Sequence, residues 1–250
     1  MKFHLQKDQL ADRELAVYLP DDYDGGEHRY PVVYVQDGGD LIDPEHSEAL
    51  RAIRELTARG VLPGLIFVGI VPFDRDDEYT PFAAPNVFEP GRLFGGNAAQ
   101  YASYLAHTLK PYVDSRYRTL PDARNTGIMG FSLGGLISVY TALLYPDVFG
   151  RVGSFSGSFW FPGFAEWIQR LPIRNAGQRL YINVGHAEGS ERTNGQQWMV
   201  PNHGTIYRHL LQTGFTGRTA SMTVYESDVH SFAKGVLYVP EAMKWLFCHS

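Results

Sequence analysis

One short stretch, residues 125–146, constrains this chain more than any other. Positions 130–134 read Gly-Phe-Ser-Leu-Gly, a G-x-S-x-G pattern. The pattern is typical of a serine held on a sharp turn between a strand and a helix. Ser132 must then take a strained backbone conformation that projects its hydroxyl, and a bulky side chain two positions away would collide with the strand or the helix. Glycine at positions 130 and 134 removes those collisions.

The residues on either side provide the context that the pattern requires. Residues 126–131 form a short, largely apolar run that predicts a buried strand. Residues 133–145 are rich in apolar residues and helix formers until Pro146, which ends a helix. A glycine-rich connection with an incidental serine is the alternative interpretation, and the order strand, tight turn, helix favours a functional serine.

The rest of the chain alternates predicted strands with predicted helices. An antiparallel edge strand is expected at 13–19, and residues 72–97 predict a long loop without regular structure, a feature that is often functional. Further strands are expected at 30–36, 65–71, 152–156, 179–184 and 221–225, and helices at 45–59, 97–117 with a bend at Pro111, 202–213 and 232–247. This alternation predicts an α/β fold with a mostly parallel sheet that helices cover on both faces.

Length and charge limit the function classes. The 250 residues fit a single α/β domain over 1–250, and a net charge of -5 without a Lys/Arg run argues against nucleic acid or an anionic membrane as partner. Residues 1–10 lack the apolar core of a signal peptide, and no segment approaches the ~18 apolar residues of a spanning helix, so we expect a cytoplasmic protein. The lone Cys248 is interpreted as a packing or surface residue. A homo-oligomer is compatible with the sequence, which does not specify the oligomeric state.

Three segments together resemble a known family. These are Gly-Phe-Ser-Leu-Gly-Gly-Leu at 130–136, Tyr-Pro-Asp-Val-Phe-Gly at 145–150 and Ser-Phe-Ser-Gly-Ser at 154–158. They are similar to the putative esterase family of α/β-hydrolases, which includes siderophore-trilactone esterases, S-formylglutathione hydrolases, feruloyl esterase domains and mycolyltransferases. The resemblance extends from about residue 13 to residue 247 and implies an α/β-hydrolase fold without a large cap domain.

A serine hydroxyl needs a nearby base, and that base needs an orienting acid. α/β-Hydrolases carry the three groups in the order serine, acid, histidine, each after a strand. Five histidines follow Ser132, namely His186, His203, His209, His230 and His249. His230 lies between the last predicted strand and the closing helix, which also matches the family histidine, and it is the predicted base. His203 and His209 are expected to be solvated.

The acid should follow the penultimate strand. Glu188 stands a few residues past the strand at 179–184, at the Gly-x-x-Asp/Glu position that the resemblance assigns to the acid. It is therefore the predicted orienting acid. Glu191 and Asp228 are the rival carboxylates.

Ester hydrolysis also needs donors for the tetrahedral oxyanion. The backbone N–H of Leu133, the residue after the nucleophile, is one expected donor. The resemblance implies that the residue after an Asp-Gly pair supplies the other, which is Gly39 here. The Asp37 carboxylate either braces that turn or is an ordinary turn residue. The sequence contains no phosphate loop, dinucleotide fingerprint or Cys/His cluster for zinc, so no cofactor or metal is expected.

We therefore predict a cytoplasmic serine carboxylesterase, a hydrolase whose catalytic triad acts on small soluble esters through an acyl-enzyme. A siderophore trilactone hydrolase and an acyltransferase remain alternatives, with a non-catalytic α/β-hydrolase relative as a further one. Arg75 is a candidate contact for the substrate, and Arg92 and Arg192 are further cations for an anionic one. Aromatic side chains of the loop at 72–97, together with Phe159 and Trp160, are expected to form a small, polar-rimmed pocket for the ester.

Overall fold

The structure is a computed structural model that describes residues 4–45, 47–174, 177–226 and 228–248. His249, one of the histidines considered above, lies outside these described residues. The main sheet has eight strands in the order β1-β2-β4-β3-β7-β8-β9-β10. Its strands are β1 (His4–Leu10), β2 (Arg13–Leu19), β3 (Val32–Val35), β4 (Ile66–Ile70), β7 (Thr126–Phe131), β8 (Arg151–Phe155), β9 (Arg179–Gly185) and β10 (Ala220–Tyr225).

Neighbouring strands are parallel along the part of this order that runs β4-β3-β7-β8-β9-β10, and the β1–β2 and β2–β4 pairs are antiparallel. This confirms the predicted mostly parallel sheet. The prediction that 13–19 is an edge strand is wrong, because β1 pairs outside β2. The β1 sequence, His-Leu-Gln-Lys-Asp-Gln-Leu, is mostly polar and gives little hydrophobic signal, which suits a strand at a solvated edge.

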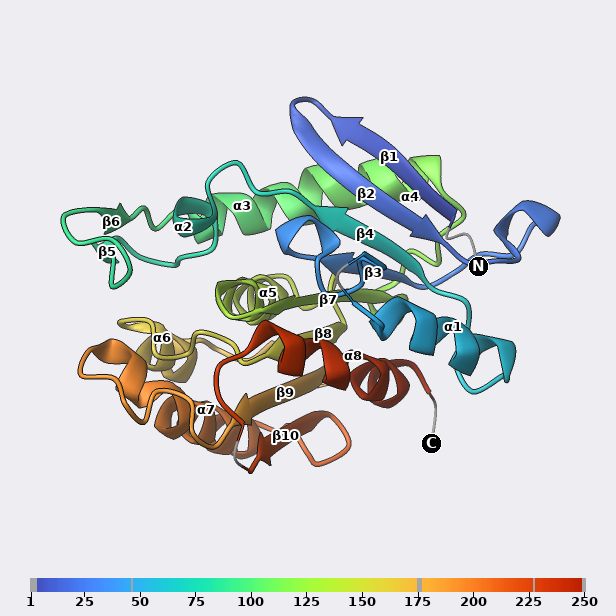
Figure 1. Cartoon of the computed structure of the whole chain (residues 1–250). Helices are drawn as coiled ribbons and strands as arrows, with labels where there is room; N and C mark the ends of the chain where they lie inside the picture. The colour runs from blue at the N-terminus through green and yellow to red at the C-terminus, as the bar shows by residue number, and fades with distance from the viewer. Residues whose placement is uncertain (1–3, 46, 175–176, 227, 249–250) are drawn as a thin grey trace.

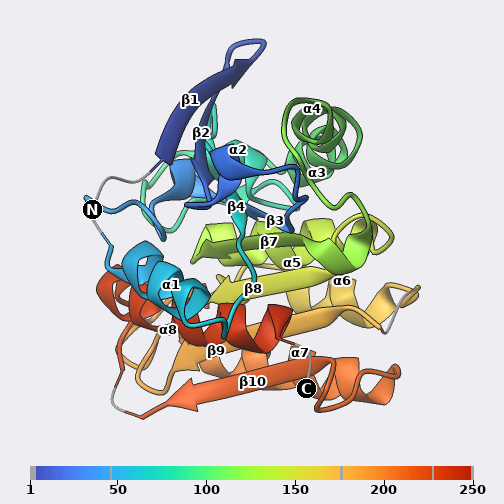
Figure 2. The same ribbon diagram turned by 90° about the vertical axis from the view of Figure 1, so that its right-hand side faces the viewer.

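Helices cover both faces of the sheet, as Figure 2 shows. One face carries α1 (Ala49–Ala58) and α8 (Phe232–Phe247), and the other carries α3 (Ala98–Tyr104), α5 (Leu133–Leu144), α6 (Phe164–Arg170) and α7 (Met199–Gln212). Side chains alternate between the faces along β3, so Val33 joins the core under α1 and α8 while Val32 and Tyr34 join the opposite core.

The predicted helix at 97–117 is one continuous helical segment without a break at Pro111. A π-helical turn at Leu105–Leu109 connects α3 to α4 (Lys110–Arg116), and Pro111 stands in the first turn of α4. Proline lacks an N–H and crowds the carbonyl four residues earlier, so a widened turn just before Pro111 accommodates it within the helix.

The segment at 72–97 is more ordered than a structureless loop. It contains α2 (Arg75–Glu78) and a two-stranded hairpin of β5 (Ala84–Pro85) and β6 (Leu93–Phe94). Asp74 caps α2 by accepting hydrogen bonds from the backbone N–H groups of Asp76 and Asp77. Figure 1 shows this segment projecting beyond the carboxyl ends of the parallel strands. It therefore lies at the edge of the sheet where the connections after β3, β7, β8, β9 and β10 meet.

Candidate active site

Ser132 occupies the sharp turn between β7 and α5 that the sequence predicts. Its backbone has φ 58° and ψ -121°, a conformation that side-chain-bearing residues rarely adopt. A Cβ on Gly130 would stand 2.5 Å from the carbonyl group of Gly134, and a Cβ on Gly134 would stand 2.9 Å from Asp37. Glycine at 130 therefore lets the turn close against the α5 backbone, and glycine at 134 leaves room for the Asp37 side chain.

His230 lies in the connection between β10 and α8, and its Nε2 is 3.1 Å from the Ser132 Oγ. The imidazole stacks on the Phe131 ring, with centroids 4.8 Å apart and planes 29° apart. Stacking leaves the side chain about one-third exposed, at 35%. The ring is thus held in one plane while its edge stays open to a substrate.

Glu188 orients the other side of this imidazole. Its Oε2 is 2.7 Å from the His230 Nδ1, and its Oε1 accepts hydrogen bonds from the Ser156 hydroxyl at 2.6 Å and the Gly185 N–H at 2.7 Å. Burial would raise the pKa of this carboxyl, but the hydrogen bonds from His230, Ser156 and Gly185 outweigh burial and lower the pKa below 4.5.

The ionised Glu188 can only accept hydrogen bonds, so the His230 Nδ1 donates to it. The Nε2 then carries the lone pair of the neutral imidazole and accepts the Ser132 hydroxyl proton. The structure therefore brings three sequence-predicted residues from three separate loops into one hydrogen-bonded chain. Such an arrangement can increase the nucleophilicity of a hydroxyl.

The rival carboxylates do not touch the imidazole. Glu191 is exposed, whereas Asp228 pairs with Lys234 at 2.9 Å and accepts a hydrogen bond from the Tyr238 hydroxyl. These two partners lower the pKa of Asp228. Its backbone carbonyl also accepts the Ala187 N–H at 3.1 Å, so Asp228 supports the loop that carries Glu188.

The prediction that His203 is solvated is wrong. The side chain is fully buried, its Nδ1 is 2.7 Å from the Met199 carbonyl, and its ring stacks on Phe159 at 4.2 Å. Burial lowers the pKa of His203 to about 4, so the ring is neutral. Pro201, two positions earlier on the same helix, is exposed, and nothing in the sequence indicated that His203 faces the core.

The expected oxyanion donors lie at the start of α5 and in the turn after β3. Leu133 is the first residue of α5, so its N–H has no acceptor within that helix. Gly39 lies in the turn, as predicted, but its N–H donates to the Gln36 carbonyl at 3.1 Å. The N–H of Gly38 has no hydrogen-bond partner among the residues that the structure describes. The assignment of Gly39 as an oxyanion donor stays a prediction. The neighbouring Gly38 is the residue of this turn whose N–H is free to donate.

Asp37 braces this turn. Its carboxylate pairs with Arg75, with 2.7 Å from Arg75 Nε to Asp37 Oδ1, and its backbone N–H donates to the Tyr79 hydroxyl at 3.0 Å. The Arg75 Nη2 also donates to the Phe131 carbonyl at 3.3 Å. Arg75 thus joins the turn after β3 to the end of β7, and its charge is largely matched by Asp37.

The aromatic residues expected around the substrate are divided between the core and the surface, and Phe73, Phe82 and Phe88 are the exposed ones. The prediction that Phe159 contacts the substrate is wrong, since its side chain is fully buried against His203 and Phe164. Trp160 is only 4% exposed and packs against Phe88 and Phe94 of the 72–97 segment. Trp160 can therefore shape a pocket through the hairpin that it supports.

Sequence reasoning assigned no role to the two serines of the connection after β8. Ser156 holds Glu188, and the Ser158 Oγ lies 3.1 Å from the Ser132 Oγ. The signal available in the sequence was the run Ser-Gly-Ser at 156–158 directly after a buried strand, where only small side chains occupy the turn.

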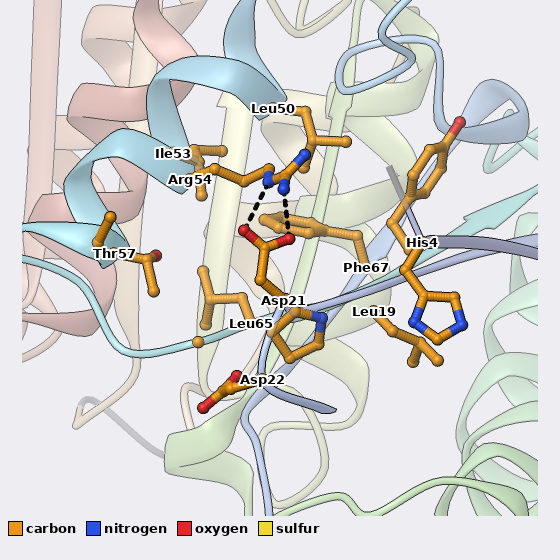
Figure 3. Close-up of a pocket in the computed structure, with 14 residues that line it drawn as sticks. His4, Leu19, Asp21, Asp22, Leu50, Ile53, Arg54, Thr57, Leu65 and Phe67 are labelled. Carbon is orange, nitrogen blue, oxygen red and sulfur yellow. Dashed lines mark hydrogen bonds and ion pairs between the residues drawn. The ribbon is translucent and has the colours of Figure 1, made fainter. Parts of the chain in front are cut away.

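A cavity of about 280 Å³ lies away from these residues, between α1, the end of β2 and the residues leading into β4. The ion pair of Asp21 and Arg54 forms part of its wall, as Figure 3 shows. Because β2 is antiparallel to β4, this cavity is at the edge of the sheet opposite Ser132. It contributes nothing to the candidate active site.

Within the described residue ranges, no three His, Cys, Asp or Glu side chains gather closely enough to hold a metal ion. No helix in the same ranges is both long and apolar enough to cross a membrane.

Comparisons with known proteins identify the family and the fold. Residues 10–231 match the sequence family described as "Putative esterase". The uncharacterized protein YbbA of Bacillus subtilis is 30% identical over 247 residues, which cover 99% of this chain and 97% of that protein. An endo-1,4-beta-xylanase/feruloyl esterase of Xylanibacter ruminicola is 26% identical over 71% of this chain and 23% of its own length.

Two solved structures show the same fold. An IroE-like serine hydrolase from Shewanella oneidensis superposes with a TM-score of 0.79 and 20% identity, over 98% of this chain and 80% of that one. The enterobactin esterase of Shigella flexneri superposes with a TM-score of 0.73 and 19% identity, over 98% of this chain and 59% of that one.

Proposed function

The chain belongs to the putative esterase family and has the α/β-hydrolase fold, and from this premise we propose that it is a serine carboxylic-ester hydrolase. The observation that carries the proposal is the hydrogen-bonded chain from Ser132 through His230 to Glu188. A nucleophile, a base and an orienting carboxylate in this order can transfer an acyl group to the serine and then to water.

In the proposed reaction, the His230 Nε2 takes the Ser132 proton as the Oγ attacks the ester carbonyl. The N–H of Leu133 and an N–H of the turn at Gly38 and Gly39 stabilise the oxyanion, and each such donor typically contributes about 3 kcal/mol. His230 then gives its proton to the leaving alcohol, which produces the acyl-enzyme. Water, deprotonated by the same imidazole, releases the acid.

We further propose that the substrate is a small, uncharged ester. Two of the three candidate cations already have carboxylate partners, since Arg75 pairs with Asp37, and Arg92 pairs with Asp74 and Glu89. An anionic siderophore trilactone would therefore meet little unmatched positive charge from these two residues. The trilactone-hydrolase alternative predicts faster turnover of a catecholate lactone than of a simple butyrate ester.

The first experiment tests the nucleophile. The wild-type protein should be labelled by a fluorophosphonate and should release p-nitrophenol from its acetate ester in a burst. Ser132→Ala should lose both, whereas Ser154→Ala, which removes a buried hydroxyl without a hydrogen-bond partner, should keep both. Labelling that survives Ser132→Ala would refute the proposal.

The same burst assay separates hydrolase from acyltransferase. If added alcohols capture most of the acyl group at concentrations far below that of water, transfer is the preferred reaction. If the free acid remains the main product, hydrolysis is preferred and the proposal stands.

A further inference from the structure

Ser158 presents a second hydroxyl to the proposed nucleophile. Its side chain is fully buried, and its Oγ is 3.1 Å from the Ser132 Oγ. Its backbone N–H also donates to the Ser132 carbonyl at 2.9 Å. Ser158 is therefore attached to Ser132 at two points, one through the main chain and one through the side chain.

The turn that carries Ser158 leaves it little freedom. A Cβ on Gly157 would stand 2.3 Å from the Ser154 Oγ and 2.8 Å from the Phe159 ring, so the backbone is in close contact on both sides. Among the residues that the structure describes, the Ser158 hydroxyl has no hydrogen-bond partner other than Ser132. A buried hydroxyl with one partner has a defined direction.

Counting protons shows which hydroxyl donates. Glu188 accepts from the His230 Nδ1, so the His230 Nε2 must accept the single proton of Ser132. Ser132 then has no proton left for Ser158, and Ser158 is the donor in the contact between the two hydroxyls. The Ser132 oxygen thus donates to the imidazole and accepts from Ser158.

We propose that Ser158 is a further catalytic residue, whose hydroxyl stabilises negative charge on the Ser132 oxygen when that oxygen leaves the acyl-enzyme. This inference rests on the proposed function. Before acylation, Ser158 already bonds the neutral serine, so that hydrogen bond contributes to the ground state as well. In the acyl-enzyme the same oxygen belongs to an ester and is a weak acceptor.

During deacylation, water adds to the acyl carbon and its proton passes to His230. The bond from carbon to the Ser132 oxygen then breaks, and His230 returns the proton to that oxygen as the acid departs. Ser158 keeps its own proton throughout. Its hydrogen bond strengthens as charge builds on the leaving oxygen, because hydrogen bonds to charged groups are about twice as strong as neutral ones. Ser158 should therefore accelerate deacylation more than acylation.

Rapid-mixing kinetics with p-nitrophenyl acetate measures the two steps separately. The burst phase reports acylation, the steady phase reports deacylation, and the burst amplitude counts active sites, so partial misfolding does not distort either rate. For Ser158→Ala we expect deacylation to slow about tenfold and acylation to slow less than about threefold. Ser154→Ala, the matched loss of a buried hydroxyl in the neighbouring strand β8, should change neither rate.

If Ser158→Ala does not fold, Ser158→Cys provides the test, since it keeps a donor at the γ position, although a larger and weaker one, and should slow deacylation by an intermediate factor. Equal slowing of both steps, or no change in either, would overturn the proposal. Absence of ester turnover in the wild-type protein, or labelling that survives Ser132→Ala, would instead mean that the proposed function has failed.

Discussion

Ser156→Ala isolates one hydrogen bond to the buried acid. The Ser156 hydroxyl donates to the Glu188 Oε1 at 2.6 Å, and the Gly185 N–H reaches the same oxygen at 2.7 Å. Ser156 has a positive φ of 47°. Alanine also carries a Cβ, so the backbone strain is common to the wild type and the variant, and only the hydroxyl is removed.

The expected size follows from the charge of the acceptor. A hydrogen bond to a charged group contributes about 1.5–3 kcal/mol. At neutral pH we expect the free energy of unfolding to fall by about 2 kcal/mol. A chain of this size would then melt about 4–8 °C lower.

The loss should depend on pH in a defined direction. The pKa of Glu188 in the folded protein is below its ordinary value of 4.5, because the three hydrogen bonds outweigh burial. A carboxyl with a lowered pKa contributes stability above its unfolded pKa and loses that contribution as pH falls through its folded pKa. Without the Ser156 hydroxyl, the pKa of Glu188 in the folded protein is lowered less. The stability difference between wild type and Ser156→Ala should therefore be largest above pH 4.5 and should narrow below it.

Urea unfolding followed by tryptophan fluorescence, at neutral pH and below pH 4.5, measures this difference. A double-mutant cycle with Glu188→Gln adds a second test, because Ser156→Ala should cost only about 1 kcal/mol beside a neutral amide. Ser154→Ala controls for loss of a buried hydroxyl that has no partner. An equal loss of unfolding free energy at both pH values, and with either Glu188 or Gln at position 188, would refute the reasoning.

Three further predictions concern the base, the sharp turn that carries Ser132, and the pocket. His230→Ala should lower kcat/KM by several orders of magnitude, Glu188→Gln by fewer, and Asp228→Asn little; a larger loss for Asp228→Asn than for Glu188→Gln would move the acid to Asp228. Gly130→Ala should destabilise the fold by about 3 kcal/mol, because its Cβ would stand 2.5 Å from the α5 backbone. Thermal unfolding measures this loss, and an unchanged melting temperature would argue against the geometry of the turn at Ser132. Acetyl to butyryl esters should react faster than decanoyl esters, and Trp160→Ala should alter that ratio; an optimum at long chains would contradict the small pocket.

Much of the site could be predicted because its residues follow strands in a fixed order. The motif around Ser132 locates the sharp turn between a strand and a helix. A parallel sheet then brings the connections after its strands to one edge. Glu188 and His230 could therefore be selected from position along the chain. The prediction needed neither the register of the strands nor the packing of the core.

The errors at Phe159 and His203 share one physical cause, which is that burial depends on tertiary contacts. Phe159 is apolar and adjacent to Trp160, and only the packing of His203 against it shows that it belongs to the core. His203 itself has no apolar signal. The turn at Gly39 depends on the close approach of Gly69, where a Cβ would stand 2.2 Å from the Gly38 carbonyl oxygen. No local pattern in the sequence reports such an approach.

The separation of Ser132 from His230 along the chain also determines when the proposed nucleophile and base come together during synthesis. His230 stands 98 residues after Ser132 and pairs with it only when the connection after β10 is in place. A ribosome that adds about 5–20 residues per second needs roughly 5–20 s to make that stretch. During this interval the nascent chain contains the serine without its base. On the proposed mechanism, acyl transfer begins only after β10 has joined the far edge of the sheet.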